Sequence, residues 1–115
     1  MLFCSRHRNT TTLLPGCIKN AIDWASRPYG ESAREGKPAA VIGASPGSMG
    51  TARAQYHLRQ ILITLNMPVV QQPEVMICNA EKWFDQDGRL TNEIPRQFLK
   101  KLLAELVRLV TTKAR

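Results

Sequence analysis

Apolar residues follow two different patterns along this chain. Residues 39–44 are apolar without interruption, which is typical of a strand covered on both faces of an α/β sheet. Three longer stretches repeat apolar residues at the i, i+3, i+4 spacing of a helix with one buried face, and they predict helices at about residues 15–27, 48–65 and 92–110. Val69-Val70 predicts a short strand or extended segment. This alternation of helices and strands predicts a parallel sheet with helices on its faces.

The remaining segments are polar or irregular. Residues 1–14 follow neither period, and we interpret them as an irregular tail or a remnant strand. Residues 15–115 are predicted to belong to one domain, because 115 residues are too few for two. A long loop is expected between Val70 and the last helix. The apolar face of that helix is predicted to consist of Phe98, Leu99, Leu102, Leu103, Leu106 and Val110.

The formal net charge of +7 is unevenly distributed. Residues 16–88 are neutral, whereas residues 1–15 carry +2 and residues 89–115 carry +5. Basic patches can bind phosphate backbones. The last helix lacks the interleaving of basic and aromatic residues that would support this, so the pattern disfavours a nucleic-acid partner.

The cysteines and the hydropathy indicate the cell compartment. Cys4, Cys17 and Cys78 are scattered and odd in number, which predicts free thiols of a reducing cytoplasm and neither a disulfide frame nor a zinc site. No apolar run approaches the roughly 20 residues that a membrane span needs. We therefore expect a cytoplasmic protein with no metal and no membrane partner.

The loop after the 39–44 strand carries the candidate chemistry. Gly43, Gly47 and Gly50 are expected to allow a tight turn and to let a ligand approach the backbone. The loop leaves the carboxyl end of a strand and enters a helix, whose free N–H groups favour an anionic or electron-rich ligand. Three interpretations are open here: a flavin or nucleotide cradle, a serine nucleophile elbow, and a plain strand-to-helix turn.

The elbow interpretation would make Ser45 a nucleophile, because residues 43–47 match G-x-S-x-G between a strand and a helix. A hydrolase also needs a histidine in a later loop. The downstream histidine, His57, is expected about three turns into the next helix, out of reach of Ser45. Nucleotide fingerprints also fail, since G-x-G-x-x-G would require glycine at position 45. The pattern disfavours both alternatives.

Two segments resemble the NAD(P)H-dependent FMN reductases. Residues 15–27 read P-G-C-I-K-N-A-I-D-W-A-S-R, which is similar to that family's P-G-x-L-K-N-A-I-D-W-x-S-R. Residues 36–38 read G-K-P before the strand, and residues 50–62 read G-T-A-R-A-Q-Y-H-L-R-Q-I-L, close to the family's G-G-x-R-A-Q-x-H-L-R-Q-I-L. The resemblance covers about residues 15–110 in the right order.

The resemblance implies an α/β, flavodoxin-like parallel sheet of order 2-1-3-4-5 with FMN at the strand ends. Hydride would pass from NAD(P)H through FMN to a quinone, a free flavin or a metal oxyanion. The family positions imply a flavin-binding set at Ser45, Pro46, Gly47, Ser48, Met49, Gly50 and Asn9. They also imply a subunit contact of a homo-oligomer at Arg53, Tyr56 and Glu74.

The chain departs from the family pattern at its N-terminal end. The first strands and the loop that holds the FMN phosphate have no counterpart, so the sequence resembles a truncated, C-terminal portion. We expect impaired FMN binding, because each charge-assisted hydrogen bond contributes roughly 1.5–3 kcal/mol. We also expect the 39–44 strand to keep one unpaired edge with exposed apolar side chains. The alternative function is a non-catalytic remnant or association module.

Overall fold

The computed structural model of the chain describes residues 2–3, 16–28, 30–32, 34–49 and 51–113. The elements are, in chain order, β1 (Leu2–Phe3), α1 (Gly16–Ala25), β2 (Ala40–Ala44), α2 (Ala52–Thr64), β3 (Val75–Ile77), a 3-10 turn η1 (Ala80–Lys82) and α3 (Glu93–Lys113).

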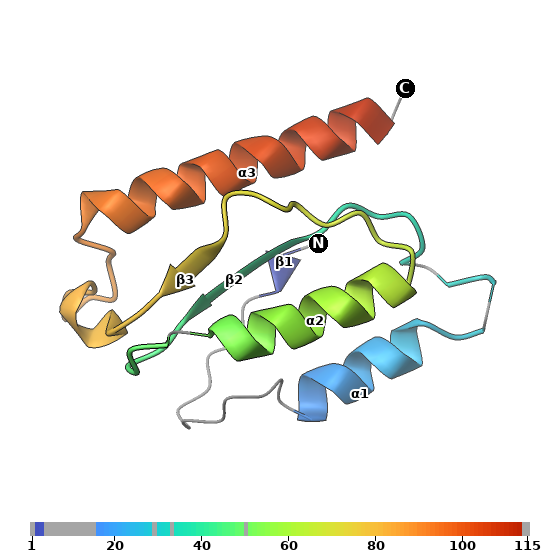
Figure 1. Cartoon of the computed structure of the whole chain (residues 1–115), viewed down its shortest axis with the longest axis horizontal. Coiled ribbons are helices and arrows are strands. Elements are labelled where there is room, and N and C mark those ends of the chain that lie inside the picture. The colour runs from blue at the N-terminus through green and yellow to red at the C-terminus, as the bar shows by residue number, and fades with distance from the viewer. Residues whose placement is uncertain (1, 4–15, 29, 33, 50, 114–115) are drawn as a thin grey trace.

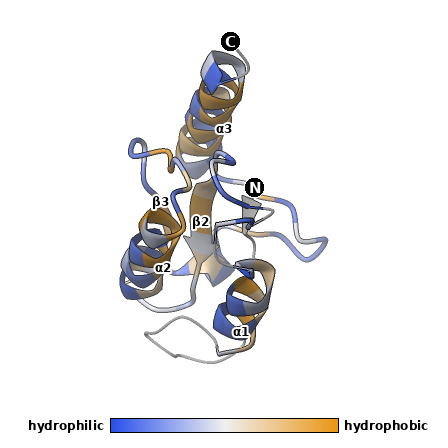
Figure 2. Ribbon diagram, turned by 90° about the vertical axis from the view of Figure 1, so that its right-hand side faces the viewer, coloured by the Kyte–Doolittle hydropathy of each residue, from blue (hydrophilic) through white to orange (hydrophobic). Residues whose placement is uncertain are grey.

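The described strands form one parallel sheet in the order β1-β2-β3. Helices α1 and α2 lie side by side on one face of this sheet, and α3 crosses the other face (Figures 1 and 2). This arrangement confirms the predicted α/β class with helices on both faces. Within the described ranges no helix is both long and apolar enough to cross a membrane.

Strand β2 is paired on both sides, which corrects one expectation. Leu2 pairs with Ala40 and Phe3 with Val41, so β1 covers the first half of the edge that we expected to be unpaired. Ala40 and Val41 are at most 1% exposed, so their predicted exposure was wrong as well. The sequence reason is local: Leu2 and Phe3 are apolar and suit an extended strand. Residues 4–14, the rest of the predicted tail, lie outside the description.

The second neighbour of β2 is a strand that the sequence pattern did not predict. Val70 N–H donates to the Ala39 carbonyl at 2.9 Å, but Val69 makes an isolated bridge and no strand. The chain then turns, and Val75–Ile77 pairs with Ile42–Ala44 inside the segment that we expected to be a loop. A run of three apolar residues is too short to show a period.

Each face of the sheet has its own apolar core. The α1/α2 side buries Ile22, Ala39, Val41, Leu58, Leu62, Met67 and Val69. The α3 side buries Ala40, Val70, Val75 and Leu102. β2 thus contributes alternate residues to both cores, as expected of a strand covered on two faces.

Helix α3 buries less of its predicted apolar face than expected. Leu102 is fully buried, and Leu99 and Leu106 pack against the core. Phe98, Leu103 and Val110 are 45%, 40% and 51% exposed. The core-facing stripe is therefore narrower than the apolar stripe of the sequence, and apolar flanks remain on both sides of it.

Candidate functional site

The candidate site is built from two loops at one edge of the sheet. Strands β2 and β3 are parallel, so their carboxyl ends lie at the same end of the sheet, and each strand is followed there by a loop (Figure 1). The Ser45 N–H donates to the Ile77 carbonyl at 2.9 Å, and the Ala80 N–H donates to the Ser45 carbonyl at 3.0 Å. The Asn79 N–H donates to the Gly47 carbonyl at 3.1 Å. These hydrogen bonds hold the loop after β2 against the loop after β3.

The loop after β3 is fixed by its own contacts. The Trp83 indole Nε1–H donates to the Cys78 carbonyl at 2.7 Å, and the Thr91 N–H donates to the Trp83 carbonyl at 2.8 Å. Asn79 adopts φ of 48°, a left-handed conformation that asparagine tolerates better than most residues. The two loops thus form a supported rim at the carboxyl ends of the strands.

Ser45 has a structural role in this rim. Its hydroxyl oxygen accepts a hydrogen bond from the Gly47 N–H at 3.1 Å, closing a turn. Its side chain is half-buried, whereas Pro46, Gly47, Ser48 and Met49 are exposed, Met49 to 58%. The predicted flavin-binding residues 45–49 are therefore neighbours on one accessible loop. Gly50 and Asn9, also predicted for the site, lie outside the described residues.

Close packing at the start of α2 explains the glycine near the end of β2. A Cβ atom at Gly43 would collide with the side chain of Thr51, the residue before α2. Gly47 has no such constraint: its φ is outside the left-handed range, and its nearest contact would be Ser45 Oγ at 3.5 Å. Gly43 is thus needed for close approach of the helix start to the strand.

The N-terminus of α2 is available to a ligand. Thr51 makes no side-chain cap hydrogen bond, and α2 has no acidic residue in its first turn. The first N–H groups of a helix have no partner within the helix, and the dipole is positive there. The N–H groups of Ser45, Gly47 and Ala52 already donate to protein acceptors. The remaining N–H groups of the loop and the helix start can donate to an electron-rich group, such as the carbonyl edge of a flavin ring, which fits the predicted cofactor.

The hydrolase alternative gains no support. His57 is exposed on α2, and among the described residues no hydrogen bond joins it to Ser45. The Ser45 hydroxyl instead interacts with the backbone of its own turn. A nucleophilic serine needs a base within hydrogen-bond reach, so this site can bind and orient a ligand but offers no acid–base pair.

The predicted subunit-contact residues lie close together. Tyr56 on α2 donates its hydroxyl to Glu74 Oε2 at 3.2 Å. Tyr56 is 49% exposed, and Arg53 is exposed one turn earlier on the same helix. Tyr56 and Glu74 thus form a hydrogen-bonded pair, and we call this pair together with Arg53 the Arg53–Glu74 cluster.

Two buried polar residues were missed by the sequence analysis. Gln55 donates to the Val75 carbonyl at 2.8 Å, and Arg59 donates from Nη1 to the Val70 carbonyl at 2.8 Å. They are 2% and 8% exposed. Together they hold both ends of the turn that carries Glu74. Their spacing to Leu62, at positions i−7 and i−3, could have placed them on the core side of α2.

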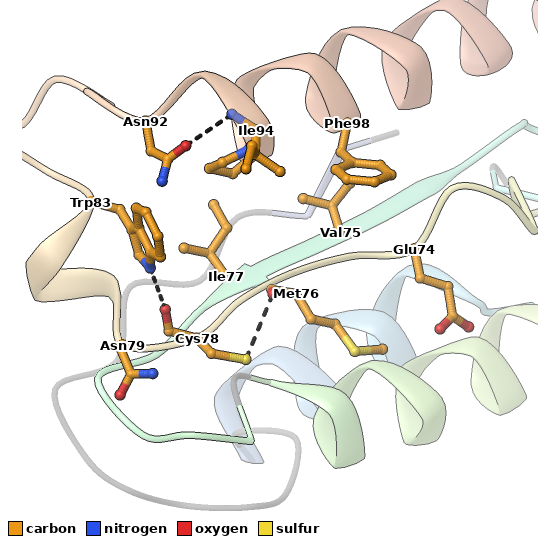
Figure 3. Close-up of a pocket in the computed structure, with 11 residues that line it drawn as sticks. Glu74, Val75, Met76, Ile77, Cys78, Asn79, Trp83, Asn92, Ile94 and Phe98 are labelled. Atoms are coloured by element: carbon orange, nitrogen blue, oxygen red, sulfur yellow. Dashed lines mark hydrogen bonds between the residues drawn. The ribbon is translucent and has the colours of Figure 1, made fainter.

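A separate hollow lies along the outer edge of β3 (Figure 3). It has a volume of about 360 Å³ and is bordered by β3, by the loop after it and by the first turns of α3. None of residues 45–49 lines it. It is therefore distinct from the predicted flavin loop.

Comparison with known proteins shows which family the chain resembles. The family described as NADPH-dependent FMN reductase matches residues 12–82. An NAD(P)H-dependent FMN reductase of Pseudomonas aeruginosa is 48% identical over 106 residues, which cover 92% of this chain and 56% of that protein. A quinone reductase of Pseudomonas putida is 47% identical over 100 residues, with coverage of 87% and 52%.

The structural comparison agrees. The flavoenzyme NAD(P)H:(acceptor) oxidoreductase FerB from Paracoccus denitrificans matches with a TM-score of 0.81 and 39% sequence identity. The match covers 96% of this chain and 60% of FerB. The chain thus spans about half the length of the curated relatives that it matches.

Proposed function

Because the chain belongs to the NADPH-dependent FMN reductase family, we propose that it supplies the ring-side half of an FMN site in an NAD(P)H-dependent oxidoreductase. The observation that carries the proposal is the accessible loop at residues 45–49, which leads into the uncapped start of α2. Relatives are named as FMN and quinone reductases, so a quinone-type acceptor is the first to test.

In this proposal the protein binds and orients, and the cofactor supplies the redox chemistry. FMN, when bound, accepts hydride from NAD(P)H and delivers reducing equivalents to the acceptor. The exposed N–H groups of the 45–49 loop and of the α2 start would hydrogen-bond the electron-rich ring edge. The exposed Met49 side chain would pack on the ring. Gly50 and Asn9 remain predicted members of the site.

The proposal also covers assembly and location. Arg53 and Tyr56 are exposed and Glu74 is half-buried, so this polar cluster is accessible to a subunit contact of a homo-oligomer. We place the protein in the cytoplasm, on the pattern of its scattered cysteines. Residues 15–115 would form the C-terminal part of the reductase domain, and residues 1–14 would stay outside it except for the β1 strand. The competing function is an association module without catalysis.

One experiment tests the function directly. The 115-residue chain is titrated with FMN while flavin fluorescence is followed, and NADPH oxidation is then measured with a quinone acceptor. We expect fluorescence quenching that saturates, with weaker affinity than the Pseudomonas aeruginosa relative shows in the same assay. Absence of quenching at tens of micromolar FMN, roughly −6 kcal/mol of binding free energy, would contradict the enzyme proposal for this chain and favour the association module.

A further inference from the structure

The hollow beside β3 has the size of a small-molecule site. Its volume of about 360 Å³ lies at the lower end of the range of roughly 300–1,000 Å³ that such sites occupy. Val75 and Ile77 of β3 point into it, and Ile94 and Phe98 of α3 lie above them (Figure 3). A ligand here would therefore have apolar side chains of a strand on one side and of a helix on the other.

Trp83 provides an aromatic wall at the end of the hollow nearest the loop after β3 (Figure 3). Its indole Nε1–H donates to the Cys78 carbonyl at 2.7 Å, and its own carbonyl accepts from the Thr91 hydroxyl at 3.1 Å. Because the indole N–H is already used, this side chain offers a ligand its ring surface and no donor. Aromatic rings pack favourably against other flat rings, so the wall suits a flat aromatic ligand.

Asn92 supplies the hollow with a hydrogen-bond donor. Its side-chain oxygen Oδ1 accepts from the Ile94 N–H at 2.9 Å and caps the start of α3. This contact identifies the oxygen of the amide, because the Ile94 N–H needs an acceptor. The amide nitrogen Nδ2 has no partner among the described residues and points towards the space beside Trp83 (Figure 3). An amide NH₂ group only donates, so the ligand atom that it would bind is an acceptor such as a carbonyl oxygen.

The charges around the hollow favour a neutral ligand. Glu74 lines it, and among the described residues no lysine, arginine or histidine does. A phosphate or carboxylate would therefore meet a like charge and no cation. The Glu74 carboxylate accepts from the Tyr56 hydroxyl at 3.2 Å and points away from α3 (Figure 3). A cationic ligand would thus have to lose its water among apolar side chains, which is costly.

We propose that the hollow beside β3 binds a small, neutral, flat aromatic molecule with a carbonyl group at its edge. The ring would pack among Trp83, Ile94 and Phe98, and the carbonyl oxygen would accept from Asn92 Nδ2. This site goes beyond the proposed function, because it needs no FMN and none of residues 45–49 lines it. Indanone, a flat two-ring ketone, has this chemistry, and indane is the same frame without the carbonyl.

Titration of the 115-residue chain with each probe, followed by proton–nitrogen NMR, tests the site. With indanone, the Trp83 indole and Asn92 side-chain amide signals should shift and saturate. The indole signal of Trp24, which is 76% exposed on α1, should not shift and serves as an internal control. Indane should bind about threefold to tenfold more weakly than indanone, as expected for the loss of one hydrogen bond.

Three variants locate the contacts. Asn92→Asp keeps an oxygen to cap α3 and removes the donor, so the dissociation constant of indanone should rise at least to that of indane. Indane binding should change less than about twofold in this variant, since indane makes no hydrogen bond. Ile94→Ala should weaken both probes about threefold or more. Val107→Ala is the matched control: Val107 is 63% exposed on the same helix and does not line the hollow, so neither probe should bind more weakly.

Indanone shifts that do not saturate up to its solubility limit, or that affect Trp24 and Trp83 equally, overturn the inference. So does a preference for indanone over indane that Asn92→Asp leaves intact. The comparison of the two probes on the unaltered chain decides if a variant does not fold: equal affinities contradict the carbonyl contact.

Repeating the titration with FMN present separates this inference from the enzyme proposal. A chain that binds indanone in the hollow but binds no FMN would contradict the reductase activity and retain the second site. Displacement of indanone by FMN would place the probe at the flavin loop and overturn the second site.

Discussion

Arg59 is a buried cation with an incomplete set of hydrogen bonds. Its Nη1 donates to the Val70 carbonyl at 2.8 Å, whereas Nε and Nη2 have no partner among the described residues. Gln55, one turn earlier, uses its amide Nε2 twice, to Thr51 Oγ1 at 2.9 Å and to the Val75 carbonyl at 2.8 Å. The Gln55 Oε1 atom also has no partner among the described residues, but Gln55 is neutral, whereas Arg59 buries a charge with two unpaired donor atoms. Burying an unpaired charged group costs more free energy than burying an unpaired neutral one, so the two residues should contribute differently to stability.

Replacement of each side chain by an apolar one tests this difference. Arg59→Met keeps the packed stem and removes a buried charge with two donor atoms that lack partners, which offsets the loss of the Nη1 hydrogen bond to the Val70 carbonyl. We therefore expect the free energy of unfolding to change by less than about 1 kcal/mol. Gln55→Leu leaves the buried Val75 carbonyl without a side-chain donor, and we expect a loss of about 1–3 kcal/mol. Urea unfolding measures both. A loss above about 3 kcal/mol for Arg59→Met would indicate a partner that neutralises the guanidinium.

Gly43, in strand β2, and Gly47, in the loop that follows it, have different local constraints. A Cβ atom at Gly43 would overlap Thr51, whereas at Gly47 it would meet ordinary van der Waals distance. We therefore expect Gly43→Ala to lower the free energy of unfolding by about 1–3 kcal/mol, and Gly47→Ala to change it by less than about 0.5 kcal/mol. Thermal or urea unfolding of the two variants checks the prediction. Equal losses would mean that the loop as a whole, and not the Thr51 contact, requires glycine.

The second residue after the end of α2, Asn66, adopts a left-handed backbone conformation. Asn66 has φ of 56°, and its carbonyl accepts from the Gly36 N–H at 2.9 Å, which ties the helix end to the segment before β2. We expect Asn66→Ala to cost about 1–2 kcal/mol, because a Cβ without a polar side chain is unfavourable there. Asn66→Gly should be near neutral, since glycine adopts this φ freely. If both variants lose equally, the Asn66 contact with Glu35 at 3.2 Å would be the stabilising feature instead.

Long elements of this chain were predictable and short ones were not. The β2 run and the apolar stripes of α1, α2 and α3 each extend over enough residues to show their period. β1 and β3 are two and three residues long, so they are recognisable only by their pairing with β2. Pairing between segments distant in sequence leaves no local pattern. The same reason hid the hollow beside β3, which combines residues from β3, the following loop and α3.

The candidate site, too, contains residues that the sequence predicted and residues that it did not. Residues 45–49 were assigned to the flavin site by family position, and they lie on one accessible loop because they are consecutive in sequence. Tyr56 and Glu74 were grouped by family position, and they meet at 3.2 Å. Gln55 and Arg59 were missed because a polar residue in an amphipathic helix is ordinarily assigned to the solvent side. Their role depends on carbonyl groups that only the folded chain brings near.

At the scale of the whole molecule, the excess positive charge does not lie in the part of the sequence that contains the flavin loop. The surplus of +5 lies in residues 89–115, and Arg53 is the described cation nearest in sequence to the 45–49 loop. The loop therefore offers N–H groups and a helix start but no cluster of cations for a phosphate. In the proposed function this region contacts the flavin ring and leaves the phosphate of FMN to other parts of a complete site.

A comparison of FMN with riboflavin tests this division, because riboflavin has the same ring without the phosphate. If the chain contacts the ring side, both ligands should bind with dissociation constants within about threefold of each other, and saturating amounts should raise the melting temperature equally. Fluorescence titration and thermal unfolding of the 115-residue chain provide the two measurements. A charge-assisted phosphate contact contributes roughly 1.5–3 kcal/mol, or more than about tenfold in affinity. FMN binding more than tenfold tighter than riboflavin would therefore place a phosphate site in this chain and contradict its assignment to the ring side alone.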